Sequence, residues 1–71
     1  MDNKITIMVK EAGKSTRELE VNPGTLKDIC QDTGISIENK TFTYNGDAVS
    51  AYSDINKDGL LMVENNHKGG N

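Results

Sequence analysis

Leu60-Leu61-Met62-Val63-Glu64 (LLMVE, residues 60–64) contains the most apolar run in the chain. A short run that is apolar at adjacent positions is typical of a strand buried on both faces, as in the middle of a sheet. Residues 4–10 alternate instead, with Ile5, Ile7 and Val9 on one face and mostly polar side chains on the other. We therefore expect residues 60–64 to form the central strand and to pair in parallel with the first strand.

A second strand is expected to pair with the first as an antiparallel hairpin. Gly13, in the turn at residues 11–14, is free to adopt a positive φ. Residues 15–21 then resume the alternation, with Leu19 and Val21 expected in the core and Arg17 at its open rim.

A short helix is expected after residues 22–24, Asn-Pro-Gly, which end the second strand because proline lacks the N–H group that a ladder needs. Thr25 is the expected N-cap, and Gly34 is the expected left-handed residue just past the C-terminus. The apolar stripe of this helix consists of Leu26, Ile29 and Cys30. With about two and a half turns the helix is too short to be stable alone, so it must pack across the hairpin.

A second hairpin is expected from residues 40–44 and 47–50, joined by the tight-turn pair Asn-Gly at residues 45–46. Tyr52 and Ile55 then lie three residues apart. This spacing predicts one short turn of helix that closes the bottom of the core before the final strand.

The chain of 71 residues is long enough for one domain, which we place at residues 1–64. From Asn65 onward every side chain is polar or absent, which predicts a flexible tail over residues 65–71.

Composition excludes several classes of function. Eight basic and eleven acidic residues give a net charge of −3 without a basic stripe, so we expect no nucleic-acid partner. The single cysteine, Cys30, cannot form an internal disulfide, which favours a reducing, cytoplasmic setting. We recognise neither a signal-peptide pattern nor an apolar run of membrane-spanning length, and therefore expect neither export nor membrane insertion.

The order of these elements resembles the β-grasp, or ubiquitin-like, fold over essentially the whole chain. This is an α+β fold with a mixed four- to five-stranded sheet, one main helix and a C-terminal tail. Within that fold the chain is most similar to the sulfur-carrier branch, which includes the thiamine-biosynthesis sulfur carrier and the small subunit of molybdopterin synthase. The matching residues are Tyr44-Asn45-Gly46 with Val49, Lys57-Asp58-Gly59, Leu60-Leu61-Met62-Val63 and Gly69-Gly70.

The resemblance implies a function for Gly69 and Gly70. In the family, a partner enzyme adenylates the C-terminal glycine, which is then converted to a thiocarboxylate or joined to an amine. Here Asn71 follows Gly70, so a protease would first have to remove it. The expected partners are an ATP-dependent activating enzyme and a tail-trimming protease, with Lys68 among the contacts and with no cofactor of the chain's own.

One alternative remains open. The tail could be an end without chemistry, and the chain a non-catalytic interaction module, an adaptor or inhibitor, that binds a protein through its sheet face or a strand edge. The expected contact residues on the sheet are Lys4, Thr6, Lys10, Arg17 and Glu18.

An independent enzyme is not expected, because His67 and Cys30 are the only residues of their kinds and form no metal set or nucleophile–base pair in the sequence. Residues 54–59 match the first half of a calcium loop. The acid that should complete the second half is replaced by Asn65, so a plain Asp-Gly turn is the preferred interpretation.

Overall fold

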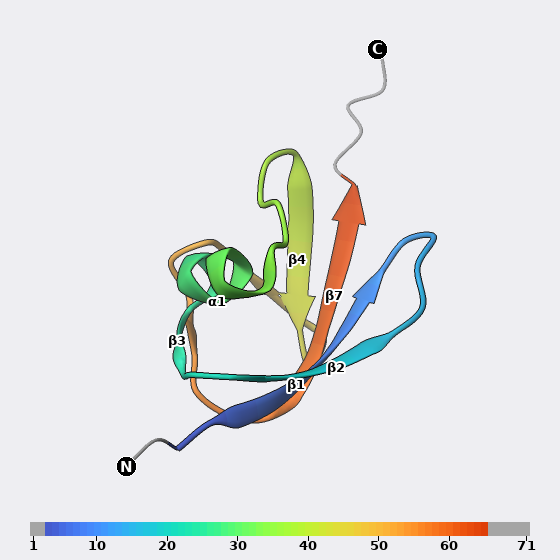
Figure 1. Cartoon of the computed structure of the whole chain (residues 1–71). Helices are drawn as coiled ribbons and strands as arrows, with labels where there is room; N and C mark the ends of the chain where they lie inside the picture. Colours follow the sequence, from blue (N-terminus) through green and yellow to red (C-terminus); the bar gives the residue numbers. More distant parts are fainter. Residues whose placement is uncertain (1–2, 66–71) are drawn as a thin grey trace.

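The computed structural model describes residues 3–65 and forms one mixed sheet with a helix packed on it (Figure 1). The elements are β1 (Ile5–Glu11), β2 (Arg17–Val21), β3 (Gly24–Thr25), α1 (Leu26–Thr33), β4 (Lys40–Tyr44), β5 (Asp47–Val49), β6 (Asp54–Ile55) and β7 (Gly59–Asn65). Five strands form the main sheet in the order β2-β1-β7-β4-β5, and β3 pairs with β6 in a separate two-stranded ribbon.

β7 is the central strand, as the sequence predicts. It pairs in parallel with β1, where Val9 lies beside Leu61, and antiparallel with β4, where Phe42 lies opposite Val63. These four side chains face the helix and are at most 5% exposed. The parallel pairing of the first and last strands is therefore confirmed.

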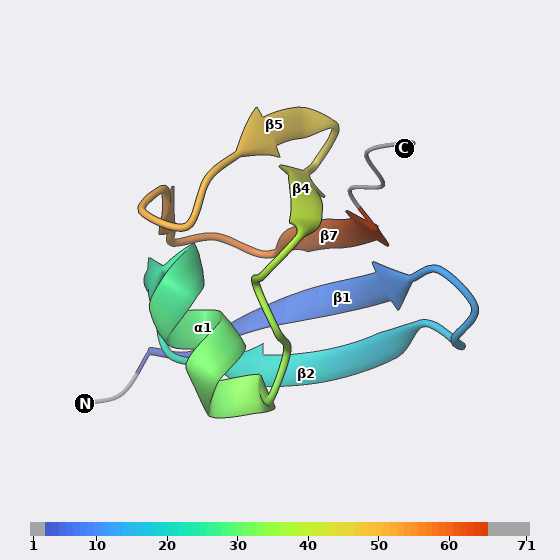
Figure 2. The ribbon, with the colours of Figure 1, turned by 90° about the horizontal axis from the view of Figure 1, so that it is seen from above.

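The expectation that β7 is buried on both faces is wrong. Leu60 is 38% exposed and Met62 is half-buried, because the single helix covers only one face of the sheet (Figure 2). Both side chains point to the uncovered face, since neighbouring residues of a strand point to opposite sides.

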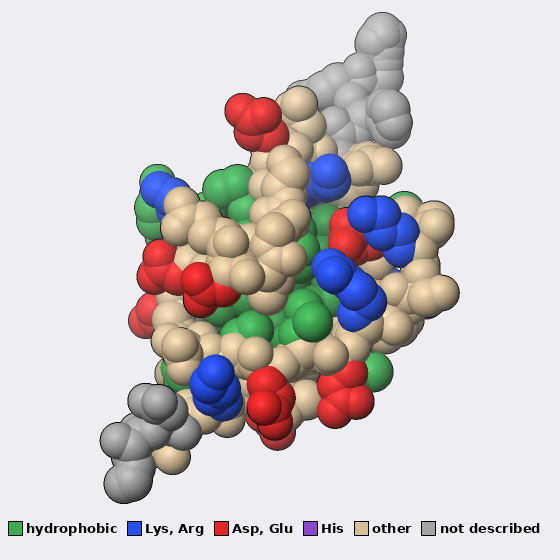
Figure 3. Space-filling model, viewed as in Figure 1, with side chains coloured by type: hydrophobic (Ala, Val, Ile, Leu, Met, Phe, Trp, Pro, Cys, Tyr) green, Lys and Arg blue, Asp and Glu red, His purple; other side chains and the backbone are tan. Residues whose placement is uncertain are grey.

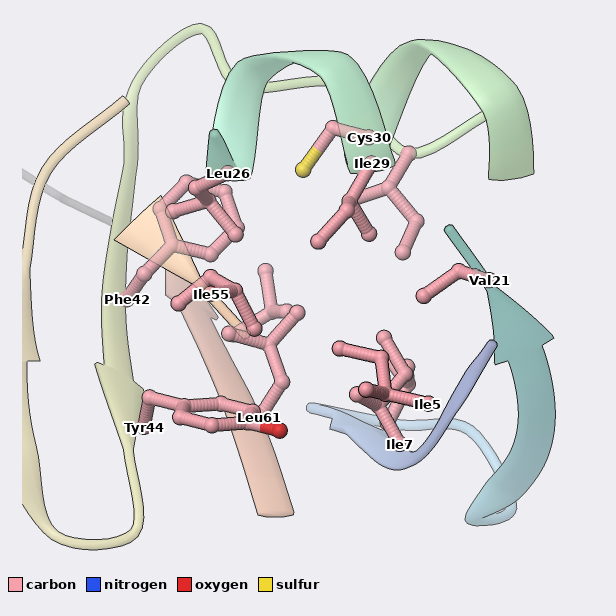
Figure 4. Close-up of a cluster of buried hydrophobic side chains, with 13 residues drawn as sticks. Ile5, Ile7, Val21, Leu26, Ile29, Cys30, Phe42, Tyr44, Ile55 and Leu61 are labelled. Atoms are coloured by element: carbon pink, nitrogen blue, oxygen red, sulfur yellow. The ribbon is translucent and has the colours of Figure 1, made fainter. Parts of the chain in front are cut away.

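The helix α1 begins and ends at the predicted signals. The Thr25 hydroxyl accepts a hydrogen bond from the Asp28 N–H at 3.2 Å, and Gly34 adopts a φ of 80°. The side chains of Leu26, Ile29 and Cys30 are each at most 1% exposed and point into the core (Figure 4). The predicted caps and the predicted apolar side of the helix are confirmed, although α1 has only eight residues.

The predicted helical turn around Tyr52 is wrong. Ile55 is buried, but it lies in β6, and Tyr52 is 77% exposed. The backbone carbonyls of Ala51 and Ser53 accept hydrogen bonds from the N–H groups of Lys27 and Leu26 at 2.8 and 2.9 Å. This loop therefore caps the start of α1, and the backbone conformation that does so turns the Tyr52 ring outward.

The two Gly-containing turns identified in the sequence meet each other. Asn45 and Gly46 have positive φ angles of 52° and 89°, and the Asn45 side-chain oxygen accepts a hydrogen bond from the Leu60 N–H at 2.9 Å. A Cβ atom on Gly59 would lie 2.5 Å from that side chain, so any other residue there would displace the Asn45 amide from its hydrogen bond. Asp58 anchors the same corner by accepting a hydrogen bond from the Thr6 N–H at 2.8 Å.

β7 extends to Asn65, which pairs with Lys40, so the strand includes the residue at which the sequence places the start of the tail. The predicted tail residues Lys68, Gly69, Gly70 and Asn71 lie outside the described residues.

Candidate functional site

The face of the sheet opposite α1 is called the outer face below. It carries those side chains of the five main-sheet strands that point away from the helix. Its members follow from the strand alternation and the register across the sheet. They are Glu18 and Glu20 on β2, Thr6, Met8 and Lys10 on β1, Leu60, Met62 and Glu64 on β7, Thr41 and Thr43 on β4, and Ala48 on β5.

An apolar stripe runs along the middle of the outer face, formed by Met8, Leu60 and Met62. Met8 is 39% exposed and lies beside Leu60, which is 38% exposed, on the next strand. Threonines and charged residues surround the stripe. An apolar centre with a polar rim is the usual composition of a protein-binding surface, and methionine adapts readily to different partners.

The structure separates the predicted contact residues into two groups. Thr6, Lys10 and Glu18 lie on the outer face beside the stripe, and Lys4 is exposed just before β1. Arg17 lies opposite Val9 and therefore points to the helix side, where its guanidinium donates a hydrogen bond to Glu11 at 3.2 Å. One partner on the outer face therefore cannot use Arg17 together with the others.

The sequence interpretation missed the stripe for an identifiable reason. Met8 occupies the polar face of an alternating strand, and the run at residues 60–63 gave no sign of which face was covered. A signal did exist, because one helix of eight residues can cover only one face of a five-stranded sheet. The apolar residues on the uncovered face could have been identified as a candidate binding surface.

A shallow depression of about 440 Å³ lies between the β1–β2 turn and the end of β7. Basic side chains gather beside this hairpin with an acidic side chain between them (Figure 3). Glu11, at the lining of the depression, pairs with Arg17 at 3.2 Å and with Lys14 at 3.8 Å. These pairs stabilise the hairpin end, and among the residues lining the depression there is no histidine or cysteine to act as a base or nucleophile.

Within residues 3–65, no three His, Cys, Asp or Glu side chains are placed to hold a metal ion. In the half calcium loop, Asp58 binds the Thr6 N–H and Asp54 lies in β6, opposite Thr25. Among the described residues, no helix has the length and apolar character needed to span a membrane.

The Cys30 thiol is 1% exposed, and burial, with a smaller contribution from the negative charge of Glu11, raises its pKa from 9.0 to about 11. A protonated, buried thiol is a poor nucleophile. We therefore interpret Cys30 as a core residue.

We expect the folding stability to fall as the pH rises from 9.0 to about 11. The thiol of the unfolded chain ionises first, so deprotonation stabilises the unfolded state, whereas below pH 9.0 both states keep the proton. Urea denaturation across this range measures the effect. The Cys30→Ala variant is less stable overall but should lack this part of the pH dependence, and an equal slope in both proteins would contradict the assignment.

No protein-family model matches the sequence, and no curated protein matches it either. Solved structures do match. The ubiquitin-like domain of an Arabidopsis thaliana protein superposes with a TM-score of 0.72 and 19% identity, covering 97% of this chain and 84% of that one. The fold is the ubiquitin-like β-grasp.

Ubiquitin from Caldiarchaeum subterraneum matches this β-grasp chain with a TM-score of 0.65 and 21% identity over 96% of this chain and 100% of its own. A designed protein based on ubiquitin matches with a TM-score of 0.69 and 18% identity over 96% and 95% of the two chains. These likenesses establish a small protein with the ubiquitin-like fold. The finer assignment to the sulfur-carrier branch stays a prediction.

Proposed function

We propose that this chain is a small ubiquitin-like carrier or modifier that acts through Gly69 and Gly70 after removal of Asn71. In this proposal an ATP-dependent activating enzyme docks on the outer face and activates Gly70, for sulfur transfer or for conjugation to an amine. The chain itself is the substrate of that enzyme and supplies no catalytic residue.

The position of the apolar stripe on β7 is the observation that supports this function. β7 contributes Leu60 and Met62 to the stripe, and Gly70 is only the fifth residue after the end of the same strand at Asn65. An enzyme that binds the stripe therefore also holds the strand from which the tail begins. Docking in this way confines the reacting end near the enzyme and raises its effective concentration at the nucleotide.

The chemistry sets two requirements for the tail. A Gly70 carboxylate oxygen attacks the α-phosphorus of ATP, pyrophosphate leaves, and an acyl adenylate forms. A sulfur or amine nucleophile then attacks the carbonyl carbon, and AMP leaves. Gly70 must therefore carry the free carboxylate, which requires loss of Asn71, and residues without a Cβ atom allow this end to enter a narrow channel.

The Met8→Glu variant tests the docking surface. A charge in the middle of the stripe is expected to raise the KM of the chain for the activating enzyme of its source organism by about tenfold or more, with little change in kcat. Chain-dependent exchange of pyrophosphate into ATP measures both constants.

The matched control for this experiment is Tyr52→Glu, which replaces an exposed apolar side chain by the same charge beside α1, away from the outer face. Its KM should be unchanged. Equal effects of the two substitutions, or no effect of either, would reject the outer face as the docking surface.

The same stripe supports a second candidate, a non-catalytic interaction module such as an adaptor or inhibitor, because the stripe is complete without the tail. Deleting residues 66–71 leaves β7 intact and separates the two functions. A module would still bind its protein partner after this deletion, whereas a carrier would lose its activity.

A further inference from the structure

We propose that the free edge of β2 is a docking edge for an extended segment of a protein partner with basic side chains at alternate positions, and that its charges prevent pairing with a second copy of this chain. β2 is one of the two edge strands of the main sheet in the described part of the chain and lies next to β1 (Figure 2). The inference concerns the sheet edge next to the stripe, not the stripe itself, and does not depend on the tail.

Backbone geometry determines which groups lie at this edge. The Thr6 N–H points toward Asp58, which immediately precedes β7, so the even-numbered residues of β1 direct their N–H and C=O groups toward β7. Because these groups alternate along a strand, the odd-numbered residues of β1 direct theirs toward β2. Their partners in the register are Arg17, Leu19 and Val21. The N–H and C=O groups of Glu18 and Glu20 consequently point away from the sheet and can pair with another strand.

Two negative charges accompany these free backbone groups. Glu18 and Glu20 lie opposite Met8 and Thr6, so both carboxylates are on the outer face, and both residues are exposed. Leu19, between them, packs against the core from the other face. The edge therefore combines unpaired hydrogen-bonding groups with a strongly acidic side.

These charges oppose association of two identical chains. Two copies of β2 that pair antiparallel about Leu19 bring Glu18 of each copy directly opposite Glu20 of the other. Shifting the two-fold axis to Glu18 or to Glu20 brings that glutamate opposite its own copy. Like charges directly opposite each other destabilise a strand pair, so every such register is disfavoured.

A partner strand with lysine or arginine opposite Glu18 and Glu20 is attracted to this edge, whereas a second copy of the chain is repelled. The partner strand gains two opposite-charge pairs while its backbone satisfies the free groups of Glu18 and Glu20. Charge complementarity thus identifies the partner as a basic segment with alternate side chains on one face.

The chain itself provides a defined probe for this edge, the Glu18→Lys/Glu20→Lys double variant. We expect the wild-type protein and the double variant each to remain monomeric alone, because each presents like charges to itself. Their equimolar mixture should associate on the order of tenfold or more tightly than either protein does with itself. Sedimentation velocity measures the association, and amide chemical shifts of residues 18 and 20 locate it.

A single substitution tests the same geometry without a mixture. In Glu18→Lys, pairing about Leu19 places the introduced lysine of each copy opposite Glu20 of the other, so this variant should self-associate. The charge control is Asp32→Lys/Glu38→Lys, which changes exposed residues outside the sheet by the same net charge as the double variant. The proposal is overturned if the mixture and Glu18→Lys stay monomeric, or if this control associates with the wild-type protein equally well.

Discussion

The Leu26→Ala variant is expected to lose about 2–5 kcal/mol of folding free energy. Leu26 is 0% exposed and points into the core cluster that includes Phe42 and Ile55 (Figure 4). Truncation removes the apolar contacts that Leu26 makes in the core and leaves a cavity, while Ile29 and Cys30 stay in place. A domain of this size has roughly 4–11 kcal/mol of stability in total, so the loss is a large fraction of it. Urea denaturation followed by circular dichroism measures the change.

Leu60→Ala is the matched control, since it makes the same chemical change on β7 at a position that is 38% exposed. We expect it to cost less than about 1 kcal/mol. Alanine has the higher helix propensity, so the loss in Leu26→Ala cannot come from weakening α1 itself. Equal losses in the two variants would contradict the one-sided core.

Local signals predicted the parts of the fold that depend on neighbouring residues. The alternation at residues 4–10, the Thr25 cap, the Asn45-Gly46 turn and the Gly34 terminus each require a particular residue type at a particular backbone conformation. Such requirements can be recognised within a few residues of sequence. They also agreed with one another, which is why the order of elements was sufficient to predict the β-grasp.

The parallel pairing of β1 with β7 was predicted from the order of the elements, but other contacts between distant segments were not. The β3–β6 ribbon joins Gly24 to Ile55, and the carbonyls of the loop around Tyr52 cap a helix that begins far earlier in the chain, at Leu26. No local pattern records these partners. The spacing of Tyr52 and Ile55 suggested a helix, but the unpaired N–H groups of α1 determined the conformation of the loop.

The candidate site was predicted only in part for the same reason. Alternation within single strands placed Lys10 and Thr6 on one face and Arg17 on the face of Leu19 and Val21, but which of these faces is open to a partner depends on where the helix packs. Whether Met8 is a core or a surface residue depends on which face the helix covers. Both are properties of the assembled sheet rather than of any one segment.

The composition of the tail is expected to decide whether the chain is activated at all. Three chains distinguish the possibilities: residues 1–71, residues 1–70 and residues 1–68. With the activating enzyme and ATP, we expect only the chain that ends at Gly70 to gain an adenylyl group by intact mass. The full chain lacks a carboxylate on Gly70, and the shorter chain ends at Lys68, whose side chain obstructs a narrow channel.

Gly70→Ala, in the chain of residues 1–70, separates the two requirements. It keeps a terminal carboxylate and adds only a Cβ atom, so adenylation should become much slower without a change in docking on the outer face. Because all these changes lie beyond β7, the folding stability should stay constant across the series. Adenylation of the full chain at Asn71 with equal efficiency would show that trimming is unnecessary and would reject the assignment of Gly70 as the reacting residue. Failure of every chain to react, with partner binding retained after deletion of residues 66–71, would favour the interaction module instead.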